Sequence, residues 1–244
     1  MRHDIGPRTL ILVSDPATER YAAAPAPASL RRVQSFLNTR STGRPPEADL
    51  LAGPASANSW LRALDWPASP RLTTDDLPPL YELRAALQAQ LEADRAEGPR
   101  TQPDLARHLE KLRWGVTIED GRLALSPEGE GWRQVAGTVL GDILVAQEHG
   151  MWARLKACRN PPCSVVFYDR SKNQSRVWHN TSDCGNLVNL RAARARQREQ
   201  GLVKGNRSTP AGRLAVPAAP GSSITGSRAA NGPPTGGTAL PQPR

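Results

Sequence analysis

The 244-residue sequence has few cysteines, few histidines and no long run of apolar residues. Its longest early apolar run, Leu10–Val13, is far shorter than the roughly 20 residues that a membrane-spanning helix needs. No small-residue cleavage site follows a proper apolar region, so we expect no secretory signal and a cytoplasmic protein. Cysteines stay reduced in that compartment, which argues against a disulfide framework. The three cysteines therefore point to a metal rather than to a bridge.

The sequence also lacks the patterns that mark common enzymes. It has no glycine-rich nucleotide loop, and no nucleophile with a base and oxyanion donors is apparent. His108 and His149 have no ligand partners at regular spacing, so we expect them to be ordinary helix residues. An enzyme is therefore the least favoured class of function.

Basic and acidic residues are numerous, but they are unevenly distributed along the chain. Residues 1–150 hold 17 Lys and Arg against 20 Asp and Glu, whereas residues 151–204 hold 11 against three. Residues 205–244 add four Arg and no acid, so the net charge of +9 comes from beyond residue 150. This concentration of basic residues favours a polyanionic partner such as nucleic acid. A basic helix that only serves solubility is the plainer alternative.

Composition and periodicity divide the chain into four parts. These are a flexible lead-in over 1–28, a mainly helical domain over 29–150, a zinc module over 151–202 and a disordered tail over 203–244. Within the helical domain, residues 114–118 and 123–125 are typical of a small β-hairpin. The fold class predicted is thus a mainly α domain with a hairpin, followed by a small treble-clef-like ββα module.

Three helices of the helical domain carry clear signals. One follows Thr74 and has an apolar stripe of Leu80, Leu83, Leu87 and Leu91. A second is expected from Gln102 to Leu112 with Leu105, Leu109 and Leu112 facing inward. For a third, Ser126 and Pro127 predict the start, as a capping residue followed by proline. This last helix is apolar on more than one face and is expected to be central.

All three cysteines lie close to His179. Cys158 and Cys163 are separated by four residues, fifteen residues follow, and His179 and Cys184 are again separated by four. Two ligand pairs of equal spacing around a hairpin-like segment are typical of a Cys₃His structural zinc site. We therefore predict that these four residues bind one Zn²⁺ ion.

Other interpretations of the same residues stay open. A catalytic cysteine needs partners that the sequence does not show, and a catalytic zinc normally keeps one position open. His179 could instead be a surface residue, which would leave a three-cysteine site or none.

We expect the zinc module to form two elements before its helix. Residues 151–157 are predicted to form a strand that leads to Cys158, and residues 164–168 and 175–178 a hairpin. A helix is expected from Gly185, with Cys184 at its start. Such a small module has too little core to stand alone, so bound zinc should supply much of its folding free energy.

Arginines recur along the helix that is expected after Gly185. Three of them lie within one stripe at spacings i, i+3 and i+7, and basic residues of the preceding turn extend the surface. The side chains that we predict to contact nucleic acid are Arg170, Lys172, Arg176, Arg191, Arg194, Arg196 and Arg198. Duplex DNA is the favoured partner. RNA is an alternative, because Phe167, Tyr168 and Trp178 could stack on bases.

The motifs of this region resemble those of the CGNR zinc finger. The matching pattern is Cys-x4-Cys, then Val166 to Ser171 (Val-Phe-Tyr-Asp-Arg-Ser), Arg176-x-Trp178-His179, x4 and Cys184-Gly185-Asn186. In that family the finger follows an ABATE domain in proteins described as stress-induced transcription regulators. Phe36-Leu-Asn-Thr-Arg40 resembles the Phe-x-Asn-Thr segment of the ABATE domain, and Trp60-Leu61 follows at about the expected distance.

The sequence departs from the family pattern in two places. His179 stands where the family usually has cysteine, a change that zinc tolerates. Leu187 stands where the fourth motif residue is arginine, and Asn189 occupies a neighbouring basic position. The resemblance implies a zinc-dependent DNA-binding transcriptional regulator whose helical domain senses a signal or forms a homodimer. The alternative is a zinc-stabilised protein-interaction module whose basic helix meets an acidic protein surface.

Overall fold

The computed structural model describes residues 15–43, 46–64, 66, 70–93, 103–119, 121–161 and 163–206. It has a helix-rich N-terminal part, two small two-stranded sheets and a Cys/His cluster in the C-terminal module, which confirms the predicted fold class. The predicted tail lies outside the described residues from 207 onward, and residues 203–206 still belong to the last helix. None of the described helices is both long and apolar enough to span a membrane.

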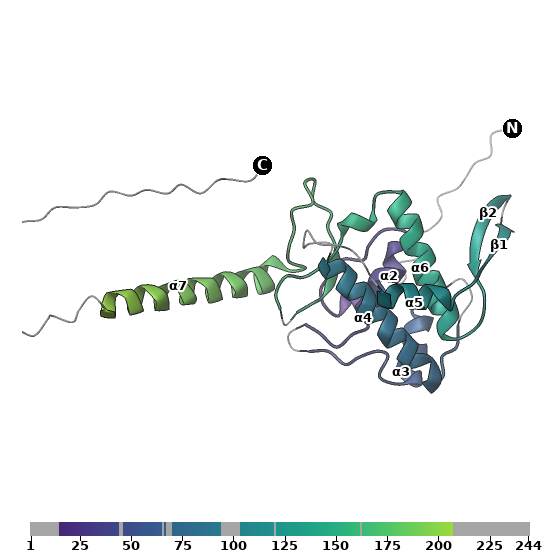
Figure 1. Cartoon of the computed structure of the whole chain (residues 1–244), viewed down its shortest axis with the longest axis horizontal. Helices are drawn as coiled ribbons and strands as arrows, with labels where there is room; N and C mark the ends of the chain where they lie inside the picture. Colours follow the sequence, from purple (N-terminus) through teal and green to yellow (C-terminus); the bar gives the residue numbers. More distant parts are fainter. Residues whose placement is uncertain are drawn as a thin grey trace, which may run out of the picture. The chain divides into compact units, whose positions relative to one another are not determined.

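Figure 1 shows the helices and strands along the chain. The helices are α1 (Pro16–Glu19), α2 (Leu30–Leu37), α3 (Pro54–Arg62), α4 (Leu77–Ala93), α5 (Pro103–Glu110), α6 (Trp132–Glu148) and α7 (Asn186–Asn206). The strands are β1 (Trp114–Glu119), β2 (Arg122–Pro127), β3 (Leu155–Ala157) and β4 (Val166–Tyr168). Both sheets are antiparallel pairs, β1 with β2 and β3 with β4.

Helices α2, α4 and α6 pack against one another and build the core (Figure 1). The leucines predicted to form the inward stripe of α4 are all buried, and the apolar residues buried in α6 include Trp132, Val135, Val139, Leu140 and Ile143. Phe36 of α2 and Trp60 of α3 are the largest fully buried side chains among the described residues, and their ring centroids are 6.2 Å apart. Burial of these side chains is the main favourable contribution to the folding free energy of this helical core.

Two expectations for the helices are wrong. Leu109 of α5 is 43% exposed rather than buried, because the side of the helix that faces inward carries His108, which is 4% exposed. Ser126 and Pro127 do not begin α6 but complete β2, and the helix begins five residues later at Trp132. Its first N–H groups are capped from another part of the chain, since the Asp76 carboxylate accepts a hydrogen bond of 2.9 Å from the Trp132 amide.

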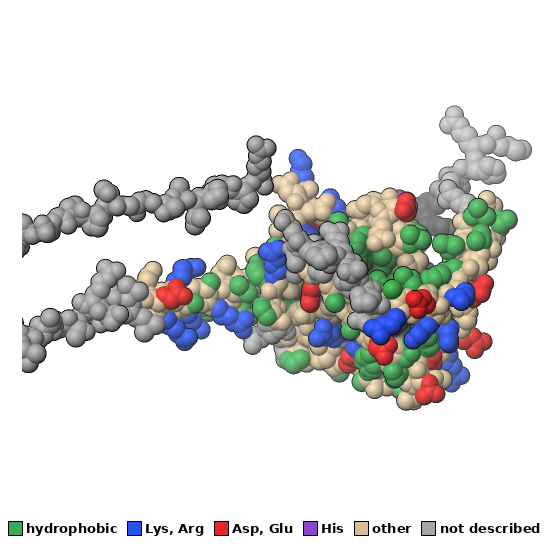
Figure 2. Space-filling model, viewed as in Figure 1, with side chains coloured by type: hydrophobic (Ala, Val, Ile, Leu, Met, Phe, Trp, Pro, Cys, Tyr) green, Lys and Arg blue, Asp and Glu red, His purple; other side chains and the backbone are tan. Residues whose placement is uncertain are grey.

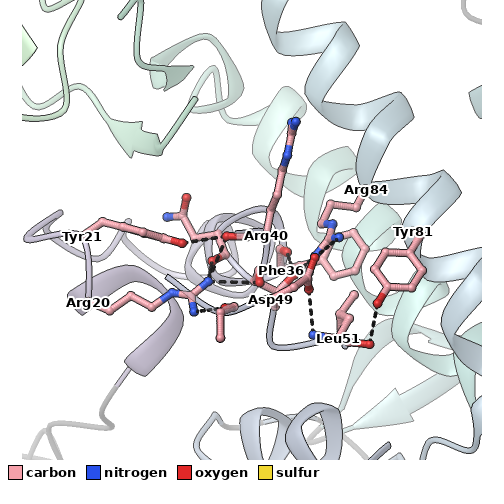
Figure 3. Close-up of polar contacts among 11 residues, drawn as sticks. Arg20, Tyr21, Phe36, Arg40, Asp49, Leu51, Tyr81 and Arg84 are labelled. Carbon is pink, nitrogen blue, oxygen red and sulfur yellow. Dashed lines mark hydrogen bonds and ion pairs between the residues drawn. The ribbon is translucent and has the colours of Figure 1, made fainter. Parts of the chain in front are cut away.

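The lead-in is also ordered where it is described, contrary to expectation. Asp15 is fully buried and accepts a hydrogen bond of 2.7 Å from the Ser35 hydroxyl of α2. Arg20 donates to the backbone carbonyls of Asn38, Thr39 and Arg40 at the end of α2 (Figure 3). These polar contacts could not be predicted from the sequence, because the segment is rich in Ala and Pro and has no apolar periodicity.

Asn38 joins the helical part of the chain to β4. Its side-chain amide donates to the Val166 carbonyl at 2.9 Å, and its oxygen accepts from the Val166 amide at 2.9 Å. The side chain thereby replaces a neighbouring strand at the free edge of β4. The side-chain amide of Gln88 in α4 donates a hydrogen bond of 3.0 Å to the carbonyl of Ser164, two residues before Val166. The first sheet residues of the zinc module consequently belong to the same core as the helices.

We expect that replacing Asn38 with alanine destabilises the whole chain. The buried Val166 amide would lose its partner, at a cost of about 2–4 kcal/mol in the free energy of unfolding. Urea unfolding of the zinc-loaded protein measures this cost. Asn173→Ala, in an exposed turn of the zinc module, is the matched control and should change stability by less than about 0.5 kcal/mol. Equal effects of the two substitutions would contradict the role given to Asn38.

Candidate metal centre

The structure brings the four predicted ligands together. The ligand atoms of Cys158, Cys163, His179 and Cys184 all lie within 4.8 Å of one another. The Nδ1 atom of His179 lies 3.3 Å from Sγ of Cys163 and 3.7 Å from Sγ of Cys184, so Nδ1 is the nitrogen that faces the cluster. The three thiols are buried and the imidazole is half-buried.

A tight turn presents the first ligand pair. Strand β3 ends at Ala157, and the Cys158 amide donates to the Val165 carbonyl at 2.8 Å. The Cys163 amide then donates to the Asn160 carbonyl at 2.8 Å, which folds the chain between the two cysteines back on itself. The strands β3 and β4 therefore flank the first ligand pair. The predicted hairpin of 164–168 with 175–178 is not formed, because β4 pairs with β3 and residues 174–178 adopt no regular structure.

The second ligand pair is set by the start of the last helix. Asn180 caps this end, since its side-chain oxygen accepts from the amides of Ser182 and Asp183. A single π turn, Thr181–Gly185, follows and carries Cys184 inward. Gly185 fits closely here, because a Cβ atom would lie 3.1 Å from Cδ1 of Trp178 and 3.3 Å from the Thr181 methyl carbon, tighter than an ordinary contact.

The donor set fits a zinc ion. With Zn–S bonds of about 2.3 Å and a Zn–N bond of about 2.0 Å, a tetrahedral ion separates its ligand atoms by about 3.5–3.8 Å. The sulfur–nitrogen distances of 3.3 Å from Cys163 and 3.7 Å from Cys184 to His179 lie close to that range. Three thiolates and one imidazole fill all four positions, which is the pattern of structural zinc sites. Cys158, Cys163, His179 and Cys184 would hold the ion, and the ion would supply folding free energy to the module.

Proximity of the thiols controls their protonation. Hydrogen bonding with the Cys163 thiol lowers the pKa of Cys158 to about 3, while the same contact raises the pKa of Cys163 well above its usual range. Burial raises the pKa of Cys184. The metal-free cluster therefore retains protons, and zinc must displace them when it binds. Zinc affinity should accordingly fall as the pH falls.

Asn160 supports the ligands from outside the coordination sphere. Its side chain is fully buried, and its amide donates to Sγ of Cys184 at 3.4 Å. Its oxygen accepts a hydrogen bond of 3.3 Å from Arg191 of α7. Asn160 thus ties the turn of the first ligand pair to the helix that carries the fourth ligand. Sequence reasoning assigned Asn160 only to a turn, since an asparagine before two prolines is an ordinary turn residue.

Asp169 organises the loop between the two ligand pairs. It is fully buried and accepts hydrogen bonds from Lys156 at 2.7 Å, from the Ser171 hydroxyl at 2.6 Å and from the Arg176 amide at 3.0 Å. Burial alone would raise the pKa of this carboxyl, but these donors together lower it below its usual range. The carboxylate stays ionised, and it holds the basic loop of residues 170–176 in place.

The predicted basic contacts fall into two groups. Arg170, Arg176 and Arg191 each donate to an acceptor of this chain, namely the Pro25 carbonyl, the His179 carbonyl and the Asn160 side chain. The second group comprises Lys172, Arg194, Arg196 and Arg198, which are exposed like the first three. The first group fixes the geometry of the basic surface, and the second is available to an external partner.

The N-terminal segment forms one wall of the centre. Tyr21 and Ala23 pack with the three cysteines and Val165, and the Tyr21 hydroxyl donates to the Arg40 carbonyl at 2.7 Å (Figure 3). Across the centre, the Gly43 amide donates to the Cys163 carbonyl at 3.4 Å. Sequence reasoning missed this wall, because it assigned Tyr21 and its neighbours to a flexible segment.

Comparison with protein families agrees with this geometry. Residues 30–147 match the ABATE family, described as “Putative stress-induced transcription regulator”, and residues 154–197 match the CGNR zinc finger. The chain is an ABATE–CGNR zinc finger protein. The CGNR match and the ligand cluster together support zinc as the bound metal. A search of curated proteins finds no match to the chain.

Leu187 marks where this CGNR finger departs from the family pattern. The side chain is half-buried and lines a cavity of about 230 Å³ beside the ligands Cys163, His179 and Cys184. Arg20 and Tyr21 of the N-terminal segment line the same cavity. Leu187 therefore borders the cavity beside the metal centre of this ABATE–CGNR protein, where an arginine would place a charge.

We expect Asn160→Ala to weaken zinc binding about 10- to 100-fold, because the Cys184 thiolate loses its hydrogen-bond donor. Asn160→Asp keeps an acceptor for Arg191 but loses the donor, so it should weaken binding as well. Competition with a chromophoric chelator at neutral pH measures both affinities. Asn173→Ala should bind zinc as the unaltered protein does. Unchanged affinity in both Asn160 variants would show that the residue does not support the metal centre.

Proposed function

We propose that this protein is a zinc-dependent transcription regulator that binds duplex DNA through its CGNR finger. The proposal rests on one observation above all: α7, which carries exposed arginines, follows directly on the π turn that holds the ligand Cys184. Cys184 lies in the first turn of this segment, and Arg191 is hydrogen-bonded to Asn160. Zinc binding would thereby fix the direction of α7 relative to the rest of the finger.

The exposed side chains of α7 have the chemistry for phosphate and base contacts. Arg194 and Arg198 are one turn apart on the same side of the helix, and both are exposed. Arginine forms bidentate hydrogen bonds with phosphate and with guanine, so this stripe suits backbone anchoring and major-groove contacts. Lys172, exposed in the loop held by Asp169, adds a further positive charge.

Net charge supports a polyanionic partner for the finger rather than for the helical part. Residues 151–204 have a net charge of +8, from 11 basic and three acidic residues, whereas residues 1–150 have −3. Three thiolates and one zinc ion subtract only about one charge from the finger. Repulsion from the acidic N-terminal part would favour contact through the basic module. With all four zinc positions filled by protein, we assign the ion a structural role and no catalysis.

An acidic protein surface is the second candidate partner. Leu190 of α7 is 47% exposed beside the arginines, so the helix offers an apolar contact as well as charge. Protein interfaces combine such contacts with a polar rim. Binding of duplex DNA at moderate salt separates the two proposals, since a protein-interaction module would not require it.

Fluorescence anisotropy with duplexes selected from a random pool tests the DNA proposal. Arg194→Gln with Arg198→Gln should lower affinity and reduce the slope of log K against log salt by about 2, one for each lost phosphate contact. The charge-matched control, Arg62→Gln with Arg71→Gln, removes two exposed arginines from the helical part and should leave the slope unchanged. Chelation of zinc should abolish binding. Equally weak binding to every polyanion would refute sequence-specific recognition.

A further inference from the structure

The hairpin of β1 and β2 has one apolar face that is largely open to solvent. The register pairs Val116 with Leu125 and Ile118 with Leu123, so all four side chains lie on the same face. Their exposed fractions are 66% for Val116, 54% for Leu125, 74% for Ile118 and 78% for Leu123. Figure 2 shows hydrophobic side chains gathered on this hairpin. A soluble protein rarely leaves so many neighbouring aliphatic residues in water.

This open face continues from the part of the hairpin that is packed on α6. Trp114 and Pro127 form the next pair on the same face, and the Trp114 indole donates to the Gly137 carbonyl at 3.3 Å. Pro127 lies so close to Gly137 that a Cβ atom there would meet it at 2.4 Å. The hairpin is therefore fixed at its base by α6, and its apolar face extends beyond that base.

Helix α6 has exposed apolar residues along the same side. Gly137, Gly141 and Leu144 follow one another at spacings of four and three, which places them on one stripe. The first two lie beneath the hairpin base, whereas Leu144 is 47% exposed and its neighbour Val145 is 45% exposed. The hairpin face and the end of this stripe together form the surface that we call the hairpin–α6 patch, which consists of Val116, Ile118, Leu123, Leu125, Leu144 and Val145.

We propose that the hairpin–α6 patch is a dimer interface occupied by a second copy of this chain. The six side chains leave roughly 600 Å² of apolar surface in water, which is as large as the largest patch expected on a monomer. Two copies would bury roughly 1,200 Å², the lower bound for a stable protein interface. This interface does not depend on the proposed binding of DNA.

The chemistry of the patch favours a second copy over other occupants. All six side chains are aliphatic, so they offer no charge to nucleic acid or to an acidic peptide. A two-fold dimer requires that a surface be complementary to itself, and a purely aliphatic surface meets its own copy without charge repulsion. A two-stranded hairpin is marginally stable in water, and among the described residues each of its two strands pairs only with the other strand. Packing against a second hairpin would stabilise both.

Sedimentation equilibrium of the full zinc-loaded chain, without nucleic acid, tests the proposal. The protein should change from monomer to dimer below about 100 μM. The double variant Ile118→Thr with Leu123→Thr keeps side chains that suit a strand and should raise the dimer dissociation constant at least about 30-fold. Leu190→Gln, which removes an exposed leucine from α7, should leave that constant unchanged. A monomer at every concentration, or equal dissociation constants for the double variant and the unaltered chain, would overturn the proposal.

Hydrogen exchange of the unaltered chain tests the same interface without any substitution. Amides of residues 114–127 should exchange more slowly at high protein concentration than at low concentration, since dimerisation covers the hairpin. Amides of α3 should exchange at the same rate at both concentrations. Exchange in the hairpin that is independent of concentration would count against the dimer even if the double variant failed to fold.

Discussion

Convergence of three sulfur atoms and one imidazole nitrogen on a single point constrains the C-terminal half of this protein. The turn between Cys158 and Cys163, the cap by Asn180 and the π turn before α7 are all arranged by that requirement. The constraint extends further than the finger itself. Tyr21 packs on the three cysteines, and Asn38 forms hydrogen bonds with β4, the strand that follows Cys163. Zinc binding and packing of the helices are therefore expected to stabilise each other.

Because of this coupling, the ABATE and CGNR regions are packed together rather than separate. Residues 30–147 and 154–197 match separate families, yet Val166 of the finger lies in the same apolar core as Phe36 of α2. Asn38 makes this contact through a side-chain amide, which can donate and accept at once along a strand edge. A signal that perturbed α2 would have a direct route to the zinc ligands. In the same way, Arg191 links the ligands to the basic helix.

Local spacing predicted more of this structure than did composition. The ligands and the inward stripe of α4 follow from periodic patterns, since each depends on residues close in sequence. Two features escaped prediction because they depend on partners far along the chain. Asp76 caps a helix that begins 56 residues later, and Asn38 meets Val166 across 128 residues. The pairing of β4 with β3 is local, but the sequence pattern favoured pairing with residues 175–178 instead. The Pro- and Ala-rich segment before α2 is likewise held by Arg20, whose side chain donates to carbonyls 18 and 19 residues further along the chain.

Scanning calorimetry of the full chain, with saturating zinc and then with a chelator, tests the claim of a single zinc-dependent unit most directly. The coupling of Asn38 and Tyr21 to the metal centre predicts one cooperative transition with zinc, and removal of zinc should lower the temperature of that entire transition. The opposite result would be a small transition that disappears on chelation while a larger one stays at the same temperature. Such independence would mean that the finger and the helical part fold separately.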